Sequence, residues 1–233
     1  MLPPFDPESI PVRARDAALP AVDPARLRPA ALRARVAQPP QWTPEVFRDA
    51  RSVLAPTRAA SVLIGLVERD DAGLQLLLTQ RNARLQQHGG QISFPGGRRD
   101  PGDVDAVHTA LREAHEEIGL EPSRVETLGT MPLYTTITGF AVTPVVALVA
   151  PDALLRADPG EVAELFEVPF SFLMDPAHHE HRSWNPENGA AAGDTTPRRS
   201  FYAMPWTSTL GQRYFIWGAT AAMIRNLYRL LVA

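Results

Sequence analysis

The sequence predicts an α/β sandwich with a mixed central sheet, preceded by a proline-rich N-terminal arm. Apolar, β-branched runs at residues 61–67, 74–81 and 140–150 are typical of buried strands. Amphipathic helical patterns occupy residues 104–118 and 219–233, between and after these runs. Strands with helices before and after them favour a sandwich over a parallel α/β barrel.

The first 57 residues form the predicted arm, because they carry 11 of the 23 prolines. Short helices are predicted at residues 31–36 and 44–50, within an ordered but irregular segment that packs on the domain or on a second subunit. A homodimer is compatible with this arrangement. Residues 58–233 are expected to form one domain.

Within that domain each element follows from its local pattern. The turn at residues 68–73 separates two strand patterns and predicts a hairpin. Further strands are predicted at 92–94, 125–131, 200–206 and 212–218, a short helix at 160–169, and a polar surface excursion at 175–199.

Composition excludes several classes of chemistry. The chain has no cysteine, and all 23 basic residues are arginines. Thiolate metal sites, disulfides and lysine-dependent catalysis are therefore excluded. A net charge of −3 argues against a nucleic-acid partner, and no apolar run is long enough for a membrane span. The N-terminus lacks a secretory pattern, so a cytoplasmic location is expected.

The helix at residues 104–118 carries the most informative pattern. Its apolar positions 107, 111, 114 and 118 form a core stripe, and Glu113, Glu116 and Glu117 gather on another face. Like charges this close are costly unless a cation neutralises them, and carboxylate oxygens suit Mg²⁺ or Mn²⁺. A solvated acidic face is the alternative. The preceding glycine pair, Gly96 and Gly97, favours the metal site, because glycine backbone approaches a metal or phosphate closely.

The same segment resembles the Nudix box, G-x5-E-x7-R-E-U-x-E-E-x-G-U, where U is aliphatic. Asp103 stands where the first glutamate is expected, and eight residues rather than seven separate it from the arginine. The resemblance implies the α/β/α Nudix sandwich. The matching residues are Gly97, Arg112, Glu113, Ala114, Glu116, Glu117, Gly119 and Leu120.

The expanded spacing resembles the coenzyme A pyrophosphatase branch of that family, which tends to read FPGG-x-x-D-x-x-D before A-L-R-E-x-x-E-E. Its upstream signature, LLTxR[SA]x3Rx3Gx3FPGG, is similar to residues 76–97. Arg81, Gly90 and the FPGG match, whereas Asn82 replaces the small residue and Gln86 the second arginine. The resemblance extends from about residue 58 to the C-terminus.

The resemblance implies hydrolysis of a nucleoside diphosphate linked to another moiety. Glu113 and Glu117 would be the leading ligands of Mg²⁺ or Mn²⁺, and Glu116 would be a third ligand or would hold a metal-bound water. The Gly97 carbonyl would complete the shell. Arg112 would orient a glutamate by a charge-assisted hydrogen bond.

The general base stays open at this point, with Glu113, Glu161 and Glu164 as candidates. With coenzyme A as substrate, the products would be 3′,5′-adenosine diphosphate and 4′-phosphopantetheine, and a 3′-phosphate must be bound. Arg81, Arg58 and Arg84 are the candidate cationic partners. His88 could hydrogen-bond phosphate or cap its loop.

Other functions compete with this one. The substrate could instead be ADP-ribose, NADH or a dinucleoside polyphosphate, and free, acylated and oxidised coenzyme A are not distinguished. A non-catalytic nucleotide sensor would usually have lost metal glutamates, and all three remain. An isomerase on the same fold would need a cysteine. The histidines at 178, 179 and 181 lack a carboxylate pattern and are not expected to bind metal.

Overall fold

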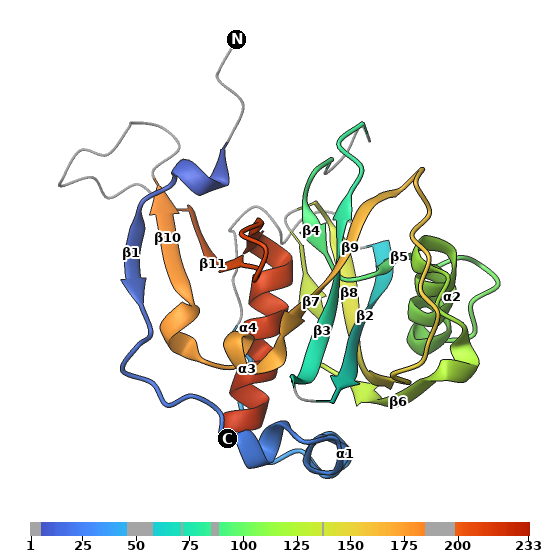
Figure 1. Cartoon of the computed structure of the whole chain (residues 1–233), viewed down its shortest axis with the longest axis horizontal. Helices are drawn as coiled ribbons and strands as arrows, with labels where there is room; N and C mark the ends of the chain where they lie inside the picture. The colour runs from blue at the N-terminus through green and yellow to red at the C-terminus, as the bar shows by residue number, and fades with distance from the viewer. Residues whose placement is uncertain (1–5, 46–57, 71, 85–88, 137, 185–198) are drawn as a thin grey trace.

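The computed structural model describes residues 6–45, 58–70, 72–84, 89–136, 138–184 and 199–233. Four layers follow one another: helix α2 (Ala106–Ile118), an eight-stranded sheet, helix α4 (Gly218–Val232) and a four-stranded sheet (Figure 1). The first three layers are the predicted sandwich. The four-stranded sheet is an additional layer that the sequence did not separate from the first.

The eight-stranded sheet is mixed, as predicted. Its order is β4-β3-β2-β8-β6, with β5 on β2, β7 on β8 and β9 on β3. β2 and β8 run parallel, and the other pairs are antiparallel. The strands are β2 (Arg58–Arg69), β3 (Gly73–Arg81), β4 (Ile92–Ser93), β5 (Gly96–Arg98), β6 (Val125–Thr130), β7 (Tyr134–Thr135), β8 (Phe140–Val149) and β9 (Val162–Pro169).

The continuous apolar runs of the central strands arise because both faces of this sheet are covered. On β2, Ile64 and Leu66 join the core that includes α4, whereas Leu63 and Val67 join the core beneath α2. A strand buried on both faces has no polar side, so alternation disappears from its sequence. None of the helices in the described part of the chain is long and apolar enough to cross a membrane.

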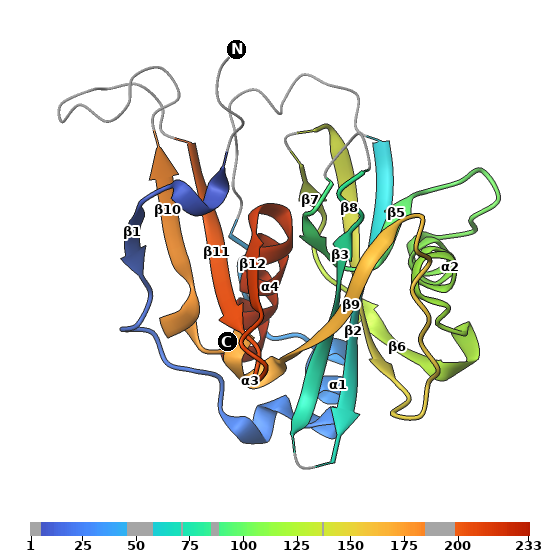
Figure 2. The ribbon, with the colours of Figure 1, turned by 45° about the horizontal axis from the view of Figure 1, so that its top comes forward.

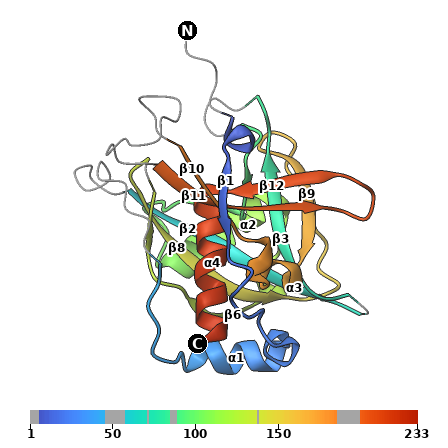
Figure 3. The ribbon, with the colours of Figure 1, turned by 90° about the vertical axis from the view of Figure 1, so that its left-hand side faces the viewer.

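The second sheet has the order β1-β10-β11-β12 and covers α4 on the side away from the first sheet (Figures 2 and 3). Its edge strand comes from the N-terminal arm, and the arm's helix α1 packs against β6. Leu32 of α1 is fully buried in the main core. The elements are β1 (Val12–Arg15), α1 (Pro29–Ala37), α3 (Phe170–Leu173), β10 (Glu180–Trp184), β11 (Arg199–Thr207) and β12 (Arg213–Trp217), with short 3₁₀ turns η1 (Pro7–Ser9), η2 (Pro24–Leu27), η3 (Pro122–Arg124) and η4 (Pro176–His178).

Two predictions about local structure are wrong. Residues 160–169 are not a short helix: β9 pairs with β3 along its length, and the turn that precedes it carries Glu161. Residues 175–184 are not a surface excursion, because β10 pairs with β1 and β11 and buries Glu180 and Arg182. Residues 185–198 and most of the helix predicted at 44–50 lie outside the described residues.

Candidate active site

Helix α2 fixes the direction of the acidic residues. The Asp105 carboxylate accepts a hydrogen bond from the His108 backbone N–H at 2.7 Å and caps the helix, which ends at Gly119 in a left-handed conformation. Ala114 and Ile118 are fully buried against the first sheet. The helix also packs against β5, so its next face points at the glycine pair.

Glu117 is the most buried carboxylate of this face, with a side chain only 3% exposed. Its two oxygens accept hydrogen bonds from the Gly96 N–H at 3.0 Å and from the Arg81 guanidinium at 3.2 Å. Burial, together with the charges of Glu113 and Glu161, raises the pKa of Glu117 to about 7, although the Gly96 N–H and Arg81 lower it. A buried carboxylate with a raised pKa and other carboxylates nearby marks a candidate functional site.

Glu113 lies against Gly97, one turn of helix earlier. A Cβ on Gly97 would lie 2.4 Å from a carboxylate oxygen of Glu113, so only glycine permits this approach. Arg112 pairs with the same carboxylate at 3.0 Å. Burial raises the pKa of Glu113, Arg112 lowers it, and the charges of Glu116 and Glu161 raise it again.

We expect Gly97→Ala to lower kcat about tenfold or more, because the new methyl group displaces the Glu113 carboxylate. The displaced atoms are the end of a flexible side chain, so the free energy of unfolding should change by less than about 1 kcal/mol. Steady-state kinetics and urea unfolding of the variant test this pair of results. Unchanged kcat would mean that the Glu113 position is irrelevant to turnover.

Arg112 organises the outer part of the site through Asp103. Two nitrogens of Arg112 donate to the two oxygens of the buried Asp103 carboxylate, each at 2.9 Å. This bidentate pair holds the pKa of Asp103 far below its usual range, and Thr109, His108 and the Asp100 backbone N–H also donate to Asp103. Asp103, which the sequence showed only as a departure from the Nudix box, is therefore the anchor of Arg112.

The third glutamate of the motif is placed differently from the other two. The Glu116 side chain is 56% exposed and accepts a hydrogen bond from Arg112 at 2.9 Å, four residues earlier on the helix. The structure thus brings Glu113 and Glu117 to the glycine pair and leaves Glu116 at the exposed edge.

The donor set suits a hard divalent cation in part. Two carboxylates beside glycine backbone are the oxygen ligands that Mg²⁺ and Mn²⁺ prefer. Among the described residues, no three histidine, aspartate or glutamate side chains converge closely enough to hold a metal by themselves. Arg81 and Arg112 pair with the two carboxylates instead. A metal at Glu113 and Glu117 would need backbone oxygen or water to complete its shell.

The structure distinguishes the two candidate general bases that follow α2 in the sequence, Glu161 and Glu164. Glu161 lies in the turn before β9, and its charge raises the pKa of both Glu113 and Glu117. Glu164 points elsewhere, because it accepts a hydrogen bond from the Tyr214 hydroxyl of β12 at 2.6 Å. Glu161 is therefore the candidate whose charge acts on Glu113 and Glu117, whereas Glu164 is paired with Tyr214.

Two of the candidate substrate residues, Arg81 and Arg58, lie at the same end of the antiparallel strands β3 and β2. Arg81, at the end of β3, contacts Glu117 directly. Arg58, at the start of β2, is exposed; its guanidinium lies 4.3 Å from the centre of the Phe140 ring and donates to the Thr138 carbonyl at 3.3 Å. Arg84 is exposed, and His88 lies outside the described residues.

The histidines at 178, 179 and 181 make structural hydrogen bonds in and beside η4 and β10. His179 is fully buried; its Nε2 lies 2.8 Å from the Leu173 carbonyl and its Nδ1 3.1 Å from the Arg225 guanidinium. His178 bonds to the Phe172 carbonyl, and His181 to Asp16. Burial lowers the pKa of His179 to about 4, because protonation would put a charge in the core facing Arg225.

Stability should therefore fall in acid through His179. The folded protein keeps this histidine neutral from its ordinary pKa of 6.5 down to about 4, whereas the unfolded chain binds the proton across that range. The contribution of His179 to the free energy of unfolding should fall by on the order of 3 kcal/mol as pH falls through this window, and stay level above it. Urea unfolding of wild type and His179→Gln from pH 4 to 8 checks this, because the variant should lack the difference.

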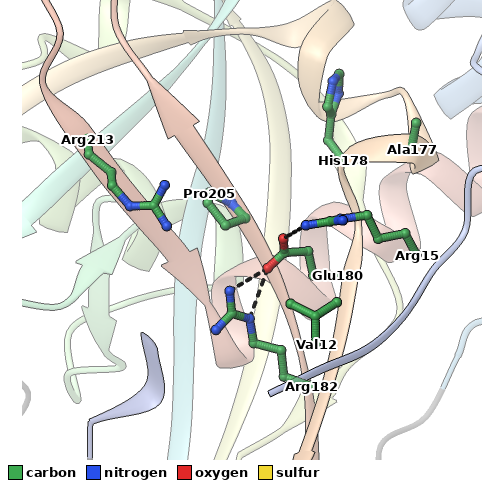
Figure 4. A pocket seen from close by; sticks show the side chains of 8 residues that line it. All are labelled: Val12, Arg15, Ala177, His178, Glu180, Arg182, Pro205 and Arg213. Atoms are coloured by element: carbon green, nitrogen blue, oxygen red, sulfur yellow. Dashed lines mark hydrogen bonds and ion pairs between the residues drawn. The ribbon is translucent and has the colours of Figure 1, made fainter. Parts of the chain in front are cut away.

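A hollow of about 490 Å³ is lined by residues of η4 and of the second sheet (Figure 4). Arginines 15, 182 and 213 line it around the buried Glu180. Arg15 and Arg182 donate to the Glu180 carboxylate, and Arg182 also donates to the Glu8 and Ile10 carbonyls. These contacts fasten the N-terminal arm to β10.

Comparison with known families supports the resemblance in the sequence. The model of the NUDIX domain matches residues 56–187, which is more than half of the chain and contains α2, β5 and the turn with Glu161.

Similar proteins carry the same family name. An uncharacterised Nudix hydrolase NudL of Escherichia coli K12 is 42% identical over 170 residues, covering 73% of this chain and 81% of the relative. One from Enterobacter sp. strain 638 is 37% identical over 194 residues, covering 79% and 86%. A crystal structure of the Nudix hydrolase RenU of M. smegmatis matches with a TM-score of 0.42 at 26% identity, covering 50% of this chain and 73% of that one.

Proposed function

The chain belongs to the Nudix hydrolase family, and from this premise we propose that it hydrolyses the diphosphate bond of coenzyme A or its derivatives. The products are 3′,5′-adenosine diphosphate and 4′-phosphopantetheine. One observation carries the proposal: two adjacent carboxylates on α2, Glu113 and Glu117, lie against the glycine pair that closes the upstream coenzyme A signature.

Glu113 and Glu117 would hold Mg²⁺ or Mn²⁺ together with the Gly97 backbone, and Glu116 would contribute through water. When bound, the cation would stabilise negative charge on the phosphate oxygens and on the leaving group. Both carboxylates are positioned by contacts of their own. Arg112, which is fixed by Asp103, pairs with Glu113, and the Gly96 N–H donates a hydrogen bond to Glu117.

Residues of this chain would activate the attacking water and bind the substrate. A carboxylate takes a proton from water as the water oxygen bonds to one phosphorus of the diphosphate. The bridging P–O bond breaks with its electron pair on the leaving phosphate. We favour Glu161 for the proton transfer, because its charge acts on both Glu113 and Glu117 and the turn that carries it is hydrogen-bonded to the end of α2. Glu113 remains the other candidate.

The upstream signature supports coenzyme A over other nucleotides. Two of its described residues contact Glu117, because Arg81 lies at the end of β3 and Gly96 at the start of β5. Arg58 adds an exposed cation at the same end of β2 and β3, suited to a 3′-phosphate.

A hydrolysis assay with Mg²⁺ or Mn²⁺ tests the proposal. It would offer coenzyme A, 3′-dephospho-coenzyme A, ADP-ribose, NADH and diadenosine polyphosphates, with products separated by chromatography. We expect coenzyme A to be preferred and to yield 4′-phosphopantetheine. If a compound without the 3′-phosphate were preferred, that compound and not coenzyme A would be the substrate. Absence of turnover with all of them would favour a nucleotide sensor.

A further inference from the structure

The turn that carries Glu161 is built from four residues, Asp158 to Glu161. The Glu161 N–H donates to the Asp158 carbonyl at 3.1 Å, and the Asp158 carboxylate accepts from the Gly160 N–H at 2.9 Å. Pro159 and Gly160 occupy the two central positions, where proline and glycine favour a tight turn. The Asp158 N–H donates to the Glu117 carbonyl at 2.8 Å, so the turn is attached to the end of α2.

Asn82 holds the other side of this turn. Its backbone N–H donates to the Glu161 carbonyl at 2.8 Å, and its side-chain amide donates to the Pro159 carbonyl at 2.9 Å. Its side-chain oxygen accepts from the Arg84 N–H at 3.1 Å, which fixes the amide orientation. Asn82 follows Arg81, the arginine that contacts Glu117. A serine or alanine here lacks an amide that could donate to Pro159.

We propose that Asn82 is a positioning residue, whose side-chain amide holds the Asp158–Glu161 turn so that the Glu161 carboxylate faces Glu113 and Glu117. This inference rests on the proposed function, because Glu161 acts only if the site hydrolyses a diphosphate. The backbone bond from Asn82 to Glu161 does not depend on the side chain and is kept by alanine or aspartate, whereas the bond to Pro159 depends on the amide alone.

The test uses Asn82→Ala and Asn82→Asp, each alone and combined with Glu161→Gln. The aspartate keeps an acceptor for the Arg84 N–H but cannot donate to Pro159, so both variants should lose the clamp. We expect kcat for coenzyme A to fall about fivefold to tenfold, with KM changed less than about twofold, because a loosened turn misplaces a reacting group. In the Glu161→Gln background, adding an Asn82 substitution should lower kcat by less than about twofold. The glutamine can no longer transfer the proton, so misplacing it has little further effect.

Two further measurements separate positioning from general destabilisation. Hydrogen exchange of the metal-free full chain should be several-fold faster in the peptide spanning residues 157–165 of Asn82→Ala, with the α2 peptide unchanged. Gln75→Ala is the matched control, because the Gln75 amide also donates to a backbone carbonyl, that of Ala72 at 2.8 Å, in the distant β2–β3 turn. It should leave kcat unchanged.

Two results would overturn the inference. If Asn82→Ala loses as much activity with Glu161→Gln as without it, Asn82 does not act through Glu161. If exchange at residues 157–165 is unchanged, the amide does not hold the turn. A wild-type enzyme that hydrolyses none of the nucleotides offered would instead remove the proposed function, and this inference with it.

Discussion

Replacing Glu117 with glutamine is expected to reduce kcat by about a thousandfold, because the change removes the charge of a carboxylate proposed to bind the metal. The glutamine oxygen can still accept the hydrogen bond that the Gly96 N–H donates to Glu117 at 3.0 Å. The local structure should therefore persist while the chemistry is lost.

The same substitution should leave the metal-free protein as stable as wild type, or more so. Burial raises the pKa of Glu117 to about 7, so above that pH the charged carboxylate lowers the free energy of unfolding. A neutral glutamine amide does not have this destabilising charge. Thermal unfolding at pH 8 in a chelator should show an equal or higher Tm. Added Mn²⁺ should raise the Tm of wild type and have a smaller effect on Glu117→Gln.

The control is Glu121→Gln, because Glu121 lies just beyond α2 with its side chain 64% exposed. It should keep the wild-type rate. A Glu117→Gln variant with more than about a tenth of wild-type kcat would show that Glu117 is not a metal ligand, since loss of a ligand typically costs far more.

Sequence pattern predicted α2 and the central strands because their signals are local. The misassigned strand, β9, shows where such signals fail. Phe166 and Val168 alternate as a strand requires and join the core that includes α4, but Val162, beyond an irregularity in the register, joins the core beneath α2, and Glu164 is a charged residue in the run. Glu164 is satisfied there by the Tyr214 hydroxyl of β12, a contact between segments 50 residues apart. Helix and strand periods are hard to distinguish in so short a run.

The candidate site was predictable to the extent that it lies on one helix. The spacing of Glu113 and Glu117 places them on one face, and the structure has them there. The partners of these carboxylates were not predictable from spacing, because Arg81 and Glu161 come from other strands and turns. Glu116 points outward because its carboxylate pairs with Arg112, which lies one turn earlier on the same helix.

Arg81→Ala is expected to lower kcat/KM about a hundredfold for coenzyme A and for 3′-dephospho-coenzyme A alike. The sequence alone suggested Arg81 as a partner of the 3′-phosphate. In the structure its guanidinium lies 3.2 Å from the Glu117 carboxylate, beside the position proposed for the diphosphate. An arginine at the scissile bond serves both substrates equally, because both contain that bond.

Arg58→Ala provides the contrast. Arg58 stacks on Phe140 at the outer edge of β2 and β8 and retains donors beyond its single bond to Thr138. We expect its loss to raise KM about tenfold for coenzyme A and less than about twofold for the dephospho substrate. The ratio of kcat/KM for the two substrates, measured in both variants, decides between the assignments. If Arg81→Ala changed this ratio and Arg58→Ala did not, Arg81 would reach the 3′-phosphate during turnover, and its contact with Glu117 would have to break when substrate binds.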